Sequence, residues 1–133
     1  MPGINILAVI AAAVAMFAIG ALWYSPFLFG KAWMRANGFA DVDLQRGNIG
    51  LIFGLAALFT LIIAADLAFF LAAPEVTLAF ALGASLAAGL GFAALSLGIV
   101  ALFERRSWTY ILVNGGYLTV GFLAMGLILG LWR

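Results

Sequence analysis

Cysteine and histidine are both absent from this sequence of 133 residues. Without thiols the chain cannot form a disulfide, and without thiolates or imidazoles it lacks the usual protein ligands of zinc, copper, haem iron and iron–sulfur clusters. We therefore expect no metal site and no cofactor.

Charged residues are also scarce. Six Lys and Arg residues and five Asp and Glu residues make up 8% of the chain and give it a net charge of +1. Because no basic run is present that could neutralise a series of phosphates, we expect no binding to nucleic acid. Hydrophobic residues account for 68% of the sequence, far above the share in water-soluble domains. The composition therefore predicts a membrane protein.

Four long apolar stretches account for most of the chain. They run from Ile4 to Tyr24, from Asn48 past Asp66 toward Pro74, from Val76 to Phe103, and from Trp108 to Trp132. Each is long enough to cross a bilayer, since about 20 helical residues span a hydrocarbon layer of about 30 Å. Backbone groups must be paired within lipid, and the alternation of a β-barrel strand is missing. The sequence predicts an all-α polytopic membrane protein, with residues 1–133 forming one domain of four transmembrane helices.

The first apolar stretch has an alternative interpretation as a cleaved signal peptide, because Ala13-Val14-Ala15 resembles a cleavage site. No basic segment precedes it, however, and the apolar run continues beyond it. We therefore expect this stretch to be retained as the first span.

The connection after the first span is expected to contain a short amphipathic helix in the membrane interface. Ser25 is predicted to cap this helix, Pro26 to occupy its first position, and Asn37-Gly38 to end it. Lys31 and Arg35 would then lie on one face, and the other face would carry Phe29, Trp33 and Ala36. Asp41 or Asp43 is predicted to cap the second span.

Basic residues predict the orientation. The first and third connections must share one side, and they contain Lys31, Arg35, Arg46, Arg105 and Arg106, whereas only Arg133 lies on the other side. The positive-inside rule places these connections in the cytoplasm. We expect a bacterial inner membrane protein with both termini on the outer, periplasmic side. Aromatic residues agree with these boundaries, since Trp23, Tyr24, Trp108 and Tyr110 cluster at the inner interface and Trp132 lies at the outer one.

Two groups of motif residues carry a family resemblance. Trp23-Tyr24-Ser25-Pro26, Phe29-Gly30-Lys31 and Trp33 resemble the N-terminal signature of the bacterial family called domain of unknown function 1761. The closing pattern of that family is similar to Phe103-Glu104-Arg105-Arg106-Ser107, Asn114, Gly116-Tyr117 and the stretch from Met125 to Trp132. The resemblance implies a small four-helix bacterial membrane protein and no particular activity. Leu118 stands where many members of that family carry His, so an imidazole-dependent function is not expected of this chain.

Asp66 is the only acid predicted to lie within a span. Charge inside a membrane is costly, so such a residue is a candidate for relaying protons or cations. Counted from Asn48 at 1.5 Å per residue, however, Asp66 lies about 27 Å along the helix, near the outer interface. We favour a hydrated carboxylate over a relay.

Asn114 and Tyr117 are three residues apart and share one helix face, with Gly115-Gly116 between them allowing a close approach by a neighbour. This pattern predicts a polar clasp between helices, and a ligand site is the alternative.

Small residues recur at four-residue spacing, which lets helices pack closely in membranes. The groups are Gly50 with Gly54, Gly126 with Gly130, Gly83 with Ala87 and Gly91, and Ala81 with Ser85 and Gly89. Because the third span has small residues on more than one face, we expect it to lie centrally or to meet a second copy.

The segment Glu104-Arg105-Arg106 is expected to signal topology and to contact lipid head groups, with Glu104 paired to a neighbouring base. Recognition of an anionic lipid or of a cytoplasmic partner is the alternative.

No catalytic constellation is present, since the sequence has no Ser-His-Asp set, no nucleophilic cysteine, no adjacent pair of catalytic carboxylates and no phosphate-binding loop. We expect a non-enzymatic bundle that contacts membrane lipids and acts through packing, as a homo-oligomer or as an accessory subunit of a larger complex. The competing hypothesis is a small transporter or channel for an ion, a proton or an apolar solute. Small multidrug exporters have this length and helix number, but the acid they use in the first span is absent here.

Overall fold

The computed structural model describes residues 3–132, and this part of the chain is helical with no strand. The elements are α1 (Ile6–Trp23), α2 (Gly30–Asn37), η1 (Asp41–Gln45), α3 (Ile49–Leu71), α4 (Leu78–Leu86), η2 (Ala87–Ala94), α5 (Leu95–Phe103) and α6 (Trp108–Leu131). Arg133, which the sequence analysis assigned to the outer side, lies outside the described residues.

Four helices among the described residues are long and apolar enough to cross a membrane. They are α1, α3, the continuous rod formed by α4, η2 and α5, and α6, with 18, 23, 26 and 24 residues. The rod Leu78–Phe103 is called the third span below. Only 22 to 28% of the residues in the most apolar part of each span are buried inside the bundle. Most of each apolar surface therefore faces outward, as expected of a multi-pass membrane protein.

Each spanning helix begins at a polar side chain that accepts a hydrogen bond from a first-turn amide. Asn5, Asn48, Thr77 and Ser107 occupy these capping positions. The prediction that Asp41 or Asp43 caps the second span is therefore wrong. Both aspartates lie in the separate 3₁₀ turn η1, where Asp43 Oδ2 accepts from the amide of Ala40 at 2.7 Å.

The short helix α2 begins later than predicted. Ser25 and Pro26 belong to the turns that follow α1, and α2 starts only at Gly30. Ser25 does not cap α2, because its hydroxyl donates instead to the Leu22 carbonyl at the end of α1, at 2.6 Å. The predicted stop is confirmed, since Gly38 ends α2 in the left-handed region with φ of 69°.

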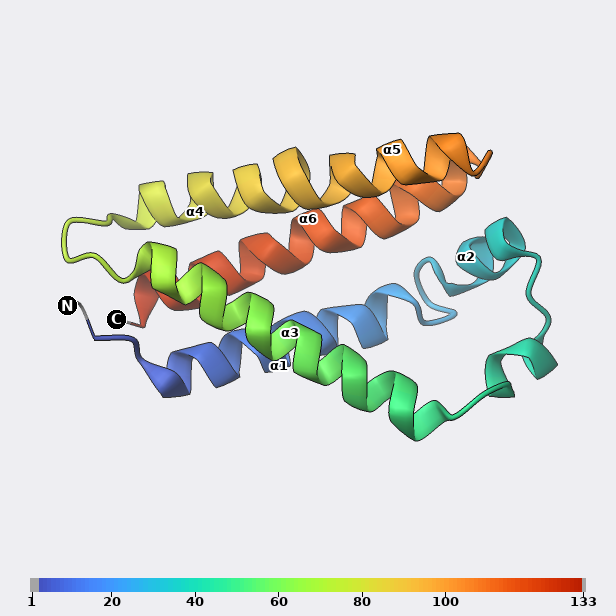
Figure 1. Cartoon of the computed structure of the whole chain (residues 1–133), viewed down its shortest axis with the longest axis horizontal. Coiled ribbons are helices and arrows are strands. Elements are labelled where there is room, and N and C mark those ends of the chain that lie inside the picture. Colours follow the sequence, from blue (N-terminus) through green and yellow to red (C-terminus); the bar gives the residue numbers. More distant parts are fainter. Residues whose placement is uncertain (1–2, 133) are drawn as a thin grey trace.

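α6 is the centre of the bundle. It packs against α1 on one side and against the third span on the other, and it also contacts α2 and α3. Helix α3 rests mainly on α1 (Figure 1). Of the two alternatives predicted for the third span, a central position is excluded, because that span packs mainly on α6 and leaves much of its surface open. Contact with a second copy stays a prediction.

The core is built from small and flexible side chains, as expected where helices pack closely in lipid. Its fully or nearly fully buried members include Ala8, Ala12, Met16, Ala64, Ala68, Leu71, Ala81 and Met125.

The middle of the third span is a π-helix, a feature absent from the sequence analysis. The Leu95 amide donates to the Leu90 carbonyl five residues earlier, in place of the α-helical step of four. This segment packs on α6, where Gly89 lies so close to Phe122 that an added Cβ would be 2.6 Å from the Cβ of Phe122. The wider π-helical turn therefore lies where the third span and α6 approach each other closely.

The two ends of the bundle carry different connections and different charged residues. The connections after α1 and after α5 lie at one end, and both chain ends and the turn between α3 and α4 lie at the other (Figure 1). The first end therefore collects Lys31, Arg35, Arg46, Arg105 and Arg106, and we call it the basic end.

Candidate functional site

Part of each motif lies at the basic end, where the end of α1 and the helix α2 pack on α6, whereas the stretch from Met125 to Trp132 lies toward the other end. Side chains from all three helices form what we call the motif cluster, consisting of Trp23, Tyr24, Trp33, Asn114 and Tyr117. The N- and C-terminal motifs thus both contribute residues to one site.

A tight turn after α1 positions the N-terminal half of the cluster. The Ser25 carbonyl accepts from the amides of Leu28 at 3.1 Å and of Gly30 at 3.0 Å. A Cβ on Gly30 would collide with the backbone oxygen of Tyr24 and would lie 2.8 Å from that of Ser25. Because only glycine fits there, the chain makes a tight turn between the end of α1 and the start of α2.

Trp23 fastens the end of α1 to α6. Its Nε1 donates to the Val113 carbonyl at 2.8 Å. The indole ring lies on Gly116, whose ideal Cβ position is 2.8 Å from Cζ2 of Trp23. A side chain at position 116 would displace this ring, so a glycine at this position allows the indole to pack against α6.

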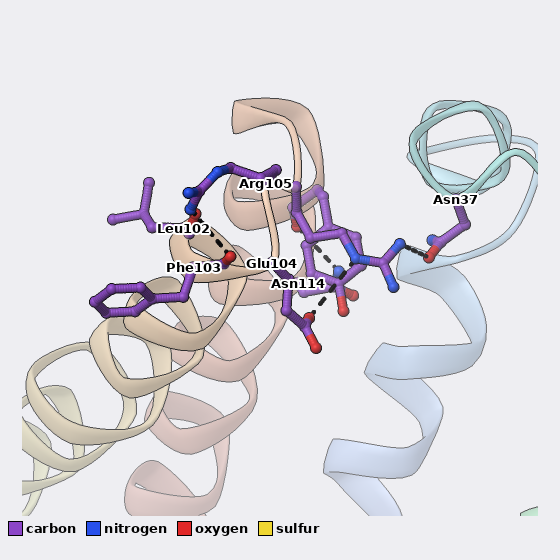
Figure 2. A network of polar contacts seen from close by, with 8 residues as sticks. Asn37, Leu102, Phe103, Glu104, Arg105 and Asn114 are labelled. Carbon is purple, nitrogen blue, oxygen red and sulfur yellow. Dashed lines mark hydrogen bonds and ion pairs between the residues drawn. The ribbon is translucent and has the colours of Figure 1, made fainter.

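Tyr24 and Asn114 make the shortest polar contact between two of the helices. The Tyr24 hydroxyl donates to Asn114 Oδ1 at 2.6 Å. Asn114, labelled in Figure 2, donates in turn through Nδ2 to the Tyr110 carbonyl at 2.9 Å. Burial raises the pKa of the Tyr24 hydroxyl well above its usual value, and the nearby Tyr117 and Tyr110 raise it further. The Tyr24 hydroxyl therefore stays protonated and keeps its role as donor.

Tyr117 makes a second connection between α6 and α1, one turn deeper. Its hydroxyl donates to the Met16 carbonyl at 3.2 Å, and its ring covers Gly20. The rings of Tyr24 and Tyr117 meet edge to face, with centroids 5.5 Å apart.

Trp33 extends the aromatic packing to α2. Its ring meets Tyr24 edge to face with a centroid separation of 5.5 Å, and its other neighbour is Phe39 at 5.4 Å. Aromatic pairs in this geometry contribute about 0.5–1.5 kcal/mol beyond area burial. These contacts dock α2 against the bundle.

Arg106 lies at the rim of the site. Its guanidinium is 5.0 Å from the ring centroid of Tyr110, 3.7 Å from Glu104 Oε1 and 3.5 Å from Oδ1 of Asn37 on α2 (Figure 2). These partly exposed contacts add a weak polar connection between α2 and the start of α6.

Arg105 does not join this group. It adopts a positive φ of 62°, and its side chain turns away from Asn37 to donate to the Phe103 carbonyl at 3.1 Å (Figure 2). Of the two adjacent arginines, Arg106 therefore contacts α2, whereas Arg105 contacts the end of α5.

The remaining candidate residues lie apart from the motif cluster. Asp66 is exposed on α3, and Lys31 is exposed on α2. Among the described residues, neither has an ion-pair partner. Pro26 takes part only in the turn after α1.

Four of the five residues of the motif cluster pair their polar side-chain groups with protein groups, and Trp33 contributes ring contacts. The hydroxyls of Tyr24 and Tyr117, the indole nitrogen of Trp23 and the amide of Asn114 each make a hydrogen bond. Within residues 3–132, no three His, Cys, Asp or Glu side chains group as metal ligands. The arrangement is suited to holding α1, α2 and α6 together.

Sequence reasoning missed the partners that are not motif side chains, namely the carbonyls of Met16 and Val113 and the surface of Gly20, whereas it expected a close approach at Gly116. The glycine at position 20 was the available signal, because it lies against the ring of Tyr117. A backbone carbonyl leaves no mark in the sequence.

Comparisons with known proteins give one match. A family model described as "Protein of unknown function (DUF1761)" matches residues 7–130. No curated protein and no solved structure matches the chain.

Proposed function

Since the chain belongs to the DUF1761 family of proteins of unknown function, we propose a function from the structure itself, namely a non-enzymatic membrane bundle that acts by packing against a second copy. The second copy would contact the open face of the third span. In this proposal the basic end faces the cytoplasm of a bacterial cell, as the positive-inside rule predicts.

One observation carries the proposal: a stripe of small residues remains uncovered after the bundle has packed. Gly83, Ala87 and Gly91 are all exposed on the third span. Apart from the backbone of its own helix, no atom of residues 3–132 lies within 4 Å of the ideal Cβ position of Gly83 or of Gly91. We call these three residues the open stripe.

The neighbouring stripe on the same span gives the contrast. Ala81, Ser85 and Gly89 are buried against α6. A Cβ on Gly126 would collide with the Ser85 hydroxyl, so the two backbones are as close as these residues allow. The third span thus has one small-residue face already used for packing and an equivalent one on its other side without a partner.

Membrane physics makes such a face a favourable contact for another helix. Lipid tails are as apolar as leucine, so helices associate in membranes through close packing, which small residues permit. A second copy is the partner we propose, because it would present the same stripe to a two-fold symmetric contact.

A packing role is better supported than transport, because the polar side chains inside the spans do not converge. Thr60 donates to the Ala56 carbonyl in its own helix at 2.7 Å, and Ser96 is exposed on the outer surface of α5. Ser85 is buried against Gly126, and Tyr117 is engaged with Met16. A water-filled path would need these groups to line one space.

A non-enzymatic role is supported by the chemistry of the motif cluster. A general acid or base must reach a reacting group, and a tyrosine that donates to a fixed backbone or amide acceptor is not free to do so. The cluster is therefore proposed to hold the bundle rigid while the open stripe makes the contact.

The test is the mass of the purified full-length protein in mild detergent. We expect a dimer or a higher oligomer of the chain. Ala87→Leu should weaken self-association at least tenfold, because it fills the open stripe. Ala65→Leu is the matched control, since Ala65 is also exposed, on α3, and we expect no change in mass. A monomer of the unaltered chain would contradict the proposal, as would a stable complex with a different protein in place of self-association.

A further inference from the structure

A second surface of the molecule, on the opposite side of α6 from the third span, has a different chemistry. It is a cleft of about 310 Å³ between the short helix α2 and the start of α6. Its walls are formed by Ala32, Arg35 and Ala36 from α2 and by Ser107 and Thr109 from the α6 side. We call it the α2–α6 cleft.

The walls combine small side chains with one cation. The alanines and hydroxyl residues leave the space open toward the surroundings. Such a space accommodates a phosphate group together with a small polar substituent.

Arg35 is the charged group of the cleft and is not neutralised by the protein. It is exposed, and no described acidic side chain lies within ion-pair distance of it. The two acids that do pair serve other arginines, Glu104 with Arg106 and Asp43 with Arg46. The guanidinium is therefore available to an anion from outside the chain, and its planar geometry suits a phosphate.

The surroundings add positive potential. Lys31 precedes Arg35 by one helical turn on the same face of α2, and Arg106 directly precedes Ser107. Three acids, Asp41, Asp43 and Glu104, lie at the same end against five bases, Lys31, Arg35, Arg46, Arg105 and Arg106, which leaves a net charge of +2. This excess of positive charge favours an anion at the cleft.

An apolar strip leads from the cleft along α6. Leu112 follows Thr109 by three positions and Val120 follows it by eleven, so all three share one side of the helix. Between Leu112 and Val120 this side is covered at Gly116 by the ring of Trp23, which is also apolar. Leu112 is 67% exposed and Val120 is 39% exposed. A ligand whose phosphate lies in the cleft can therefore extend an acyl chain along this strip toward the middle of the membrane.

We propose that the α2–α6 cleft binds the phosphate head group of an anionic phospholipid from the leaflet at the basic end. Arg35 contacts the phosphate, and the strip of Leu112 and Val120 contacts an acyl chain. The joint presence of an unpaired guanidinium and an adjoining lipid-facing strip favours a phospholipid over a soluble phosphate. This proposal is independent of self-association, since the open stripe lies on the third span.

The experiment uses the purified full-length protein in mild detergent, incubated with equal amounts of phosphatidylglycerol and phosphatidylcholine that carry the same acyl chains. Native mass spectrometry counts the lipids that remain bound. We expect preferential retention of phosphatidylglycerol. Arg35→Gln should weaken that retention about fivefold, the equivalent of about 1 kcal/mol for one basic side chain near an anionic leaflet, and should leave phosphatidylcholine unchanged.

Arg105→Gln is the matched control, because it removes the same charge at the same end of the bundle from a side chain directed away from α2. Its retention of phosphatidylglycerol should stay within twofold of the native chain. Ala36→Leu fills the cleft without changing charge, and it should also reduce retention. Equal losses of phosphatidylglycerol retention in Arg35→Gln and Arg105→Gln would overturn the proposal, because they would indicate diffuse electrostatic attraction to the whole basic end. Equal retention of the two lipids by the native chain would overturn it as well.

A further variant separates a phospholipid from a soluble anion. Leu112→Ser shortens the apolar strip and should weaken phosphatidylglycerol retention while the charge of the cleft is unchanged. Full retention in this variant, together with displacement of the lipid by inorganic phosphate, would assign the cleft to a soluble anion and overturn the lipid proposal.

Discussion

The Tyr24 hydroxyl oxygen lies 2.6 Å from Oδ1 of Asn114, although the two residues are 90 positions apart in the chain. This hydrogen bond connects the end of α1 to α6 at the basic end, and the Tyr24 ring continues the contact to Trp33 on α2. Parts of the two sequence motifs therefore form one structural unit. The contribution of this unit to stability can be measured separately from lipid binding and self-association.

The first prediction concerns the energy of this contact. Tyr24→Phe and Asn114→Ala should each lower the thermal stability of the protein in detergent. A double-mutant cycle should give a coupling energy of about 0.6 kcal/mol, the average for interhelical hydrogen bonds in membranes. Tyr110→Phe is the control, because no hydrogen bond of the Tyr110 hydroxyl is seen among the described residues. Additive effects of the two substitutions would show that the contact contributes nothing to stability.

The second prediction compares two glycines that differ only in their neighbours. Gly126→Ala should destabilise the bundle by about 1–3 kcal/mol, the usual cost of overpacking, because the new Cβ meets Ser85. Gly83→Ala should not destabilise it, because nothing lies within 4 Å of that position. Thermal unfolding at dilutions that favour monomers provides the measurement. Ser85→Gly should partly rescue Gly126→Ala, and a failure to do so would refute the proposed collision.

The third prediction tests the turn that positions α2. Gly30→Ala should detach α2 from the bundle, since its Cβ has no room beside the carbonyls of Tyr24 and Ser25. Trypsin should then cleave after Lys31 or Arg35 faster than in the native chain. Gly54→Ala is the control, because the space around Gly54 is open, and its cleavage rate should be unchanged. Equal protection of the Gly30→Ala variant would mean that α2 does not depend on this turn.

The fourth prediction concerns Asp66. The residue is exposed on α3, five residues before the helix ends at Leu71. As a hydrated carboxylate near the interface, it should be replaceable by Asn with no change in proton flux across reconstituted vesicles. Protein-free vesicles give the baseline. A flux that requires the native chain and disappears in Asp66→Asn would establish a relay and revive the transport hypothesis.

The fifth prediction concerns orientation, and the absence of cysteine makes it simple to test. Lys31→Cys and Glu75→Cys place single thiols at opposite ends of the bundle. A membrane-impermeant maleimide should label position 75 in cells with a permeabilised outer membrane, and position 31 only after the inner membrane is opened. The native chain supplies a background without thiols. Labelling of both positions from the same side would exclude the four-span topology.

The sequence alone determined the number and approximate limits of the spans, since backbone groups in lipid must pair within a helix and the apolar runs are long enough for this. It also determined the end of α2, because Gly38 adopts a left-handed conformation at little cost. These features depend on local chemistry and on run length, both of which are visible in the residues themselves.

Only the tertiary structure decided which helix lies at the centre, where α2 begins and which small-residue stripe is covered. Each span is apolar on all sides, so hydropathy does not mark the face that packs. The choice of partner depends on close shape complementarity between backbones, as between Gly126 and Ser85. Ser25 shows the same limit, because its hydroxyl donates to the Leu22 carbonyl of α1 instead of capping α2.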